Sequence, residues 1–133
     1  MQTDFAGGYV GWLGLDFLEV DGDHVVAAWD VRPDQHQPYG LVHGGVYCSV
    51  IESLASIGGA FWYGERGQVV GVHNATDFLR SVREGRLTAR AEPVHRGRLQ
   101  QLWLVEIRDP DDRLIARGQV RLQNLPQEQA AGR

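Results

Sequence analysis

Residues 35–64 contain a single charged side chain, that of Glu52, when histidine is counted as neutral. Apolar side chains recur through this stretch at helical spacing; they are Val42, Val46, Val50, Ile51, Leu54, Ala55 and Ile57. We expect a helix from about Gly44 to about Gly58, ended by Gly58 and Gly59, with helix or loop over 60–67. Because apolar groups would cover most of its sides, this helix needs protein around it.

Glu52 is the residue that this pattern singles out. A buried carboxylate costs several kcal/mol unless it is paired, hydrogen-bonded or neutralised. We therefore expect Glu52 to be functional, with a pKa raised by desolvation that suits a base or a nucleophile. The alternative is an ordinary glutamate on a face of the helix that meets solvent.

The rest of the chain has the alternation of β-strands. We expect strands over residues 9–19, 24–31, 69–78, 86–95, 99–109 and 113–123. Turns are expected at Asp21–Asp23, Gly97–Arg98 and Asp109–Asp112, a loop over 32–40, and a frayed polar tail over 126–133. This order predicts an α+β fold in which a curled antiparallel sheet surrounds one long helix. One sheet would leave part of the helix uncovered, so we expect a second subunit.

Length and composition limit the function. The 133 residues predict one domain, 1–133, with its core at about 9–123. A net charge of −4 disfavours nucleic acid as a partner, and no apolar run is long enough to span a membrane. The single cysteine, Cys48, excludes an internal disulfide and is expected to pack as a small hydrophobe, which fits a reducing, cytoplasmic location. We find no secretion signal at the N-terminus.

Basic residues gather in two places, and a local basic patch on an acidic protein suits a small phosphorylated ligand. The alternative is a set of solvated strand ends. The first group is Arg80, Arg83 and Arg86, and the second is Arg90, Arg96 and Arg98.

His43-Gly44-Gly45 opens the predicted helix, where backbone N–H groups lack internal acceptors and can polarise a carbonyl. The alternative is that the glycines only permit a tight entry into the helix. Gly44 and Glu52 are eight residues apart, which is about 12 Å along a helix. A glutamate side chain cannot span that distance. If both groups act on one carbonyl, they come from different chains, and the site lies at a two-fold dimer interface.

Four further residues have weaker signals. Ser56 lies one turn beyond Glu52, where its hydroxyl could orient the carboxylate or a water, or bond to the helix backbone. Gln37 is a neutral donor in the preceding loop. His36 and His43 do not have metal-ligand spacing, so we expect no metal or other cofactor.

The residues together resemble the hotdog-fold acyl-CoA thioesterases. The closest branch contains phenylacetate-pathway, Arthrobacter-type 4-hydroxybenzoyl-CoA and 1,4-dihydroxy-2-naphthoyl-CoA thioesterases. The resemblance covers about residues 9–123. Its motifs are QHQPYGLVHGG at 35–45 with Glu52 and Ser56, VGVHNAT at 70–76, FLRSVREG at 78–85, VHRGR at 94–98 and ARG at 116–118.

The resemblance implies roles for the helix residues. Glu52 attacks the thioester carbonyl or activates the water that does. The backbone N–H of Gly44, from the partner subunit, polarises that carbonyl with help from Gln37. His43 shapes this end of the site, and Ser56 orients the carboxylate or the water.

The resemblance also implies contacts with the substrate and its CoA moiety. These come from Gly45, Asn74, Arg80, Ser81, Arg83, His95, Arg96, Gly97 and Arg98. Family members often have proline where this chain has Ser81, which puts the position of Arg80 in doubt. A glutamate rather than an aspartate at position 52 indicates the aromatic acyl-CoA branch. Phe61, Trp62 and Tyr63 could wall an aromatic pocket or simply pack in the core.

The leading hypothesis is hydrolysis of an acyl-CoA with an aromatic or medium-length acyl group, aromatic above all. The enzyme is expected to be a cytoplasmic homo-oligomer, at least a dimer and expected to be a tetramer. One alternative is hydration or dehydration of an acyl thioester, with His43 and Glu52 moving protons. Another is a non-catalytic acyl-CoA-binding domain. The sequence leaves open whether Glu52 acts as a nucleophile or as a general base.

Overall fold

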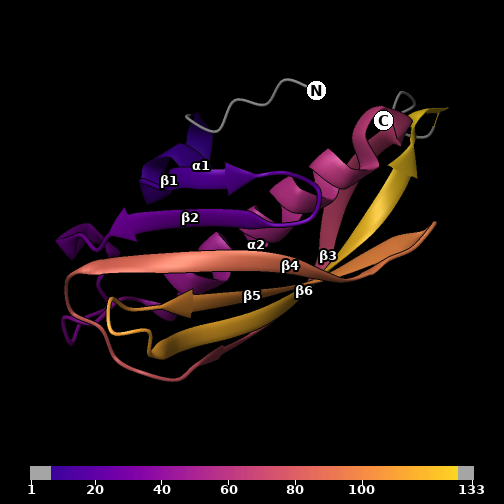
Figure 1. Cartoon of the computed structure of the whole chain (residues 1–133). Coiled ribbons are helices and arrows are strands. Elements are labelled where there is room, and N and C mark those ends of the chain that lie inside the picture. The colour runs from indigo at the N-terminus through magenta and orange to yellow at the C-terminus, as the bar shows by residue number, and fades with distance from the viewer. Residues whose placement is uncertain (1–6, 129–133) are drawn as a thin grey trace.

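The computed structural model describes residues 7–128 as one antiparallel sheet curled around a long helix (Figure 1). The sheet has the order β1-β2-β4-β5-β6-β3. Its elements are α1 (Gly8–Leu13), β1 (Asp16–Val20), β2 (Val25–Asp30), α2 (Gly44–Tyr63), β3 (Gly67–Phe78), β4 (Arg86–Arg96), β5 (Gln100–Arg108) and β6 (Leu114–Pro126), with 3₁₀ turns at Pro33–Gln35 and Gly64–Arg66. The predicted α+β architecture is confirmed. No helix of the described residues is long and apolar enough to cross a membrane.

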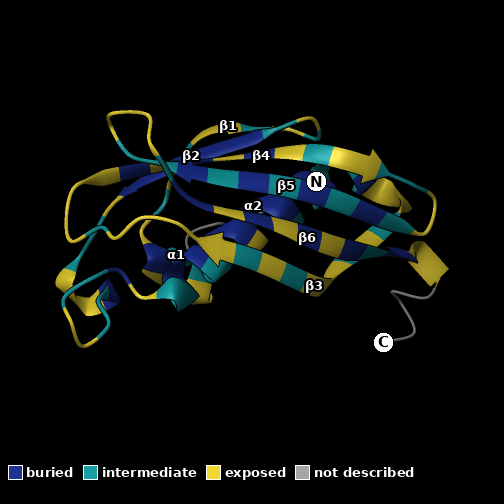
Figure 2. Ribbon diagram, turned by 90° about the horizontal axis from the view of Figure 1, so that it is seen from below, coloured by how far each residue is buried: buried dark blue, intermediate teal, exposed yellow. Residues whose placement is uncertain are grey.

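Alternating side chains of the sheet form the core with α2 (Figure 2). On β5, Trp103, Val105 and Ile107 point inward and are completely buried, and the residues between them are partly exposed. Ile51 and Leu54 of α2 are also completely buried. Each such side chain contributes about 1.5–3 kcal/mol relative to an exposed one, so the sheet fixes the position of α2.

The predicted strand over residues 9–19 is wrong in its first half. Residues 8–13 form α1 instead, and only Leu13 of this helix is buried. Gly14 ends the helix in a left-handed conformation, with φ of 75°, and the strand β1 begins two residues later. α1 therefore lies outside the sheet.

Gly58 and Gly59 are not the stop signal that we expected, because α2 continues to Tyr63. Both glycines are buried against the sheet. A Cβ atom on Gly58 would lie 2.7 Å from the Trp103 ring, and one on Gly59 would collide with Leu122. The glycines therefore allow close approach of helix and sheet.

The buried side chain of Gln101 joins the end of α2 to two strands. Its amide oxygen accepts a hydrogen bond from Trp103 Nε1 at 2.8 Å. Its amide nitrogen donates to Asn124 Oδ1 at 2.9 Å and to the Gly59 carbonyl at 3.2 Å. Each of these polar groups thus has a partner inside the core.

The expectation that α2 is apolar on nearly all sides is wrong for the single chain. Ser49, Ser53 and Ser56 are only partly buried on its outer face, and Glu52 is exposed. The alternative, a glutamate that meets solvent, describes the isolated protomer. The sheet covers one side of the helix and leaves this small-residue face open.

The predicted tail, residues 126–133, lies mostly outside the described residues. At its start, Pro126 is the last residue of β6 and pairs with Gly67 of β3. β3 is the last strand of the sheet, with β6 as its one neighbour among the described strands.

Candidate active site

The N-terminus of α2 offers a free backbone donor. His43 caps the helix: its Nδ1 accepts from the Gly45 N–H at 2.7 Å, and its carbonyl accepts from the Val46 N–H at 2.9 Å. Within residues 7–128, no acceptor is found for the Gly44 N–H. A helix N-terminus carries partial positive charge, so this N–H suits a carbonyl oxygen that gains negative charge.

Gly44 borders a small cavity of about 260 Å³. The Phe78 ring covers this glycine so closely that a Cβ atom would lie 2.6 Å from Cζ. Gln37 also lines the cavity, and its side-chain oxygen accepts from the Tyr39 N–H. Its NH₂ group has no hydrogen-bond partner within residues 7–128 and can therefore donate. Gly44 and Gln37, predicted separately, therefore meet here as two donors.

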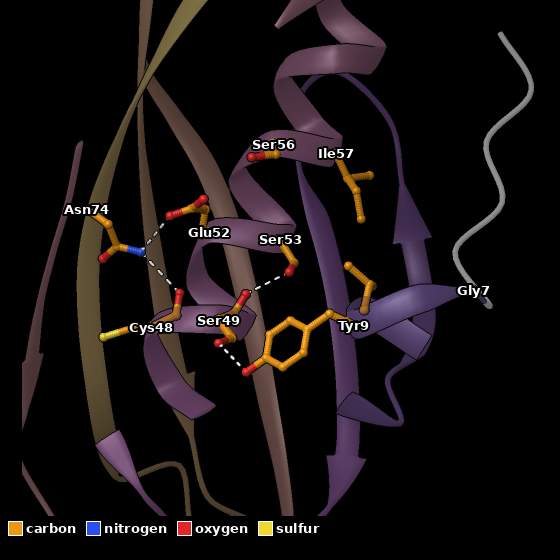
Figure 3. A pocket seen from close by; sticks show the side chains of 10 residues that line it. Gly7, Tyr9, Cys48, Ser49, Glu52, Ser53, Ser56, Ile57 and Asn74 are labelled. Atoms are coloured by element: carbon orange, nitrogen blue, oxygen red, sulfur yellow. Dashed lines mark hydrogen bonds between the residues drawn. The ribbon is translucent and has the colours of Figure 1, made fainter. Parts of the chain in front are cut away.

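Glu52 lies on the outer face of α2 against β3 (Figure 3). Asn74 Nδ2 is 3.4 Å from Glu52 Oε1 and donates to the Cys48 carbonyl at 3.0 Å. The Thr76 hydroxyl donates to Asn74 Oδ1 at 2.7 Å, which fixes the orientation of the amide. Asn74, expected to contact substrate, thus also holds the carboxylate, a role that sequence reasoning missed.

A larger cavity of about 660 Å³ opens in front of Glu52. Its walls come from α1, α2 and β3 (Figure 3). The lining residues are Gly7, Tyr9, Val10, Cys48, Ser49, Glu52, Ser53, Ser56, Ile57 and Asn74. The wall formed by α1 was not foreseen, because this segment was expected to be a strand.

Ser56 lines this cavity one turn beyond Glu52. Within the described part of the chain, its hydroxyl has no hydrogen bond to Glu52 or to a helix carbonyl. Ser49 and Ser53 differ, since they donate to the carbonyls of Gly45 and Ser49. Ser56 is therefore the helix serine whose hydroxyl remains free to meet a ligand.

The two halves of the predicted site do not meet within one chain. Gly44 and Gln37 line the small cavity, Glu52 lines the large one, and no described residue lines both. Gly44 and Glu52 are eight residues apart on the helix, which separates them by about 12 Å. A single protomer thus carries an acid and a carbonyl-binding group that face different spaces.

The first predicted basic cluster lies near the N-terminus of α2. Arg80 and Ser81 line the small cavity with Gly44, and the Arg80 guanidinium has no ion pair within residues 7–128. Arg83 instead donates to the Tyr39 carbonyl at 3.1 Å and so supports the loop before the helix.

Arg96 and Arg98 of the second cluster lie at the opposite end of α2, whereas Arg90 lies within β4 and pairs with Glu19 and Glu92. Arg96 donates to Asp23 Oδ1 at 2.9 Å and to the Gly22 carbonyl at 2.7 Å, and it covers the Trp62 ring. Gly97 and Arg98 form the turn between β4 and β5, beside His95. The length of α2, about 30 Å, separates the two clusters in one protomer.

The three aromatic residues at the end of α2 lie in different surroundings. Arg66 lies over the rings of Trp62 and Tyr63, which therefore pack at the helix end. Phe61 lines a separate cavity of about 240 Å³, together with Ser56.

Comparison with known proteins gives the family. Residues 39–116, more than half of the chain, match the family model described as the thioesterase superfamily. The chain belongs to the thioesterase superfamily. Thioester hydrolysis is therefore its reaction class, and the fold is the hotdog fold that the sequence resemblance implied.

Several relatives of this thioesterase are similar over most of their length. Rv1847 of Mycobacterium tuberculosis, provisionally named an esterase, is 58% identical over 116 residues, 85% of this chain and 83% of the relative. The 1,4-dihydroxy-2-naphthoyl-CoA hydrolase of Escherichia coli K12 is 35% identical over 81% of this chain and 79% of its own. The crystal structure of S. sahachiroi AziG has a TM-score of 0.89 and 55% identity, and covers 90% of this chain and 98% of that chain.

Proposed function

We propose that this thioesterase hydrolyses an acyl-CoA, with an aromatic acyl group preferred, to the free acid and CoA. The observation that carries the proposal is the Glu52 carboxylate, held by Asn74 at the wall of an open cavity of about 660 Å³. Such a volume suits a small organic ligand. The aromatic preference rests on the sequence resemblance and on the name of the relative in E. coli.

Glu52 can act in two ways, and both break the same C–S bond. As a general base, it takes a proton from water while the water oxygen attacks the carbonyl carbon, and the proton passes to the departing thiolate. As a nucleophile, it forms a mixed anhydride with the acyl group and releases the thiolate, which takes a proton from solvent, and water then hydrolyses the anhydride. Neither route needs a metal or another cofactor.

The carbonyl oxygen would be held by the Gly44 N–H and the Gln37 amide of the partner subunit, with His43 fixing the helix start. The edge strand β3 supports this pairing. In one chain, Glu52 lies against Gly71 of β3, and Phe78 of β3 covers Gly44. If two β3 edges pair antiparallel with Gly71 opposite Phe78 of the partner subunit, the partner's Gly44 comes close to Glu52. An uncovered edge strand favours such pairing.

The same proposal assigns the remaining contacts. Arg80 is the best candidate for a CoA phosphate, because it lines the cavity of Gly44 and has no ion pair within residues 7–128, whereas Arg83 and Arg96 already bind backbone carbonyls. The assembly would be a dimer at least, and a tetramer if dimers associate. A single cysteine fits a cytoplasmic location.

The first test is thiol release from aromatic and aliphatic acyl-CoAs, measured with a thiol-reactive dye. Glu52→Gln keeps the shape of the side chain but removes the carboxylate, so we expect turnover to fall at least about 100-fold with substrate binding retained. Glu65→Gln, exposed beyond the end of α2, is the matched control and should be unchanged. Near-normal turnover in Glu52→Gln would refute the role of Glu52.

A second test addresses the two-chain site. Gly44→Val should be inactive, since its side chain would collide with Phe78. Co-expression of Glu52→Gln and Gly44→Val chains with different tags gives mixed dimers, each with one intact site. Random pairing predicts recovery of about a quarter of wild-type activity. No recovery in purified mixed dimers would mean that the two groups do not act across the interface.

A further inference from the structure

The cavity in front of Glu52 has a wall that belongs to α1. Tyr9 faces the outer side of α2 across this cavity (Figure 3), and its hydroxyl lies 2.8 Å from Ser49 Oγ. Because the Ser49 hydroxyl donates its hydrogen to the Gly45 carbonyl, the Tyr9 hydroxyl is the donor in this contact. The hydrogen bond joins residues 40 positions apart and fixes the ring at one end of the cavity.

The Tyr9 ring also separates two cavities. On its far side lies a cavity of about 530 Å³ that runs along the first turn of α2, past His43 and Gly45. Tyr9 is the one described residue that lines both this cavity and the Glu52 cavity. Removal of the ring would therefore join the two spaces.

The chemistry of the Glu52 cavity suits the acyl group and not the nucleotide. No arginine or lysine lines it in the described part of the chain, so it offers no cation to a phosphate. Val10 and Ile57 supply apolar surface. Ser49 and Ser53 use their hydroxyl hydrogens on helix carbonyls, so within the described residues Ser56 is the serine of this cavity whose hydroxyl is left to donate.

The support of Tyr9 is firm, although 59% of the residue is exposed. Its ring stacks on Trp12, with ring centroids 5.8 Å apart and planes 14° apart. The end of α1 is held by Arg32, which donates to the Trp12 carbonyl at 2.6 Å, and by the fully buried Leu13. The ring is thus positioned by two independent contacts, Ser49 and Trp12.

We propose that Tyr9 is the specificity-determining end wall of the acyl pocket and sets the longest acyl group that reaches the Glu52 carboxylate. This inference rests on the proposed acyl-CoA hydrolysis. Tyr9→Ala opens the pocket toward the 530 Å³ cavity and should admit longer acyl groups. Tyr9→Trp fills more of the pocket and should exclude them.

The experiment measures kcat/KM for hexanoyl-, decanoyl-, benzoyl- and naphthoyl-CoA. We expect the decanoyl-to-benzoyl ratio to rise about tenfold in Tyr9→Ala and to fall in Tyr9→Trp, because steric fit in an apolar pocket changes selectivity by about this factor. Tyr9→Phe keeps the ring and should stay within about twofold of wild type. Tyr39→Ala, a residue that is 82% exposed and lines neither cavity, is the control.

Binding measurements test the role of Tyr9 separately from the proposed hydrolysis. Calorimetry with the same four esters, in chains that carry Glu52→Gln, measures the length preference without turnover. An unchanged preference in both Tyr9→Ala and Tyr9→Trp would overturn the role of Tyr9, whatever the wild type hydrolyses. If no ester releases thiol but the binding preference shifts as stated, the role of Tyr9 is supported and the proposed hydrolysis of these four esters is refuted.

Discussion

The hydroxyl of Tyr47 is a buried polar group without a hydrogen-bond partner in the described part of the chain. Only 3% of the residue is exposed, and burial raises the pKa of Tyr47 to about 12. An unpaired buried donor costs about 1–3 kcal/mol. Tyr47→Phe deletes this oxygen and leaves the ring, so it should raise the free energy of unfolding at pH 8 by about that amount.

The difference in free energy of unfolding between Tyr47→Phe and wild type should grow at alkaline pH. The phenol has a pKa of about 10 in the unfolded chain and about 12 in the folded one. The folded state therefore holds its proton more tightly, and this contribution is complete below pH 10 and lost as the pH rises toward 12. At about 1.4 kcal/mol per pKa unit, wild type should lose about 2 kcal/mol by pH 11.5 that Tyr47→Phe does not lose.

Urea unfolding, followed by tryptophan fluorescence at one protein concentration, measures both effects between pH 8 and pH 11.5. The constant concentration matters because association also stabilises the folded state. Tyr39→Phe, at an exposed position, corrects for the general alkaline response. If Tyr47→Phe is less stable than wild type at pH 8, or the gap between them does not change with pH, the hydroxyl has a partner and the reasoning fails.

Two further predictions concern the core and the site. Gln101→Leu leaves the Trp103 indole N–H and Asn124 Oδ1 of β6 unpaired, so the free energy of unfolding in urea should fall by about 2–6 kcal/mol. Gln100→Leu is the neighbouring control. A fall of less than about 1 kcal/mol in Gln101→Leu would contradict the hydrogen-bond network. Asn74→Ala removes the donor to Glu52 and should lower kcat about tenfold while KM and the melting temperature change little; an unchanged kcat would mean that Asn74 does not position the carboxylate.

The strands of the second half of the chain could be predicted because their signals are local. Apolar and polar residues alternate over β5 and β6, and turn residues stand at Gly97 and Asp109–Asp112. These signals predicted the ends of both strands to within three residues. α1 was missed for the opposite reason. Six residues are too few for helical periodicity to appear, and the glycines around them resemble strand-end turns.

The meaning of a glycine in a helix depends on what faces it. Gly58 and Gly59 have the composition of a helix end, yet Trp103 and Leu122 of the sheet require the absence of side chains there. Both partners lie more than 40 residues away in sequence. No local pattern distinguishes such a contact from a stop.

The sequence predicts which residues could form the candidate site, but it does not predict what surrounds them. The helix spacing correctly separated Gly44 from Glu52. The exposure of Glu52 was only the alternative interpretation, because an uncharged stretch with small residues resembles a helix that is buried on all sides. Tyr9 and Asn74 reach the site through contacts over 40 and 22 residues, which the sequence does not indicate.

α1 and α2 contribute differently to the core and to the site, and this difference affects which substitutions the fold tolerates. α1 has one buried side chain, Leu13, and α2 carries both the core contacts and Glu52. If Tyr9 has the proposed role, substitutions along the exposed side of α1 should therefore alter the selectivity for the acyl group at little cost in folding, and without altering Glu52. Libraries of variants with substitutions only in α1 would therefore test new acyl groups while Glu52 and the rest of α2 stay unchanged.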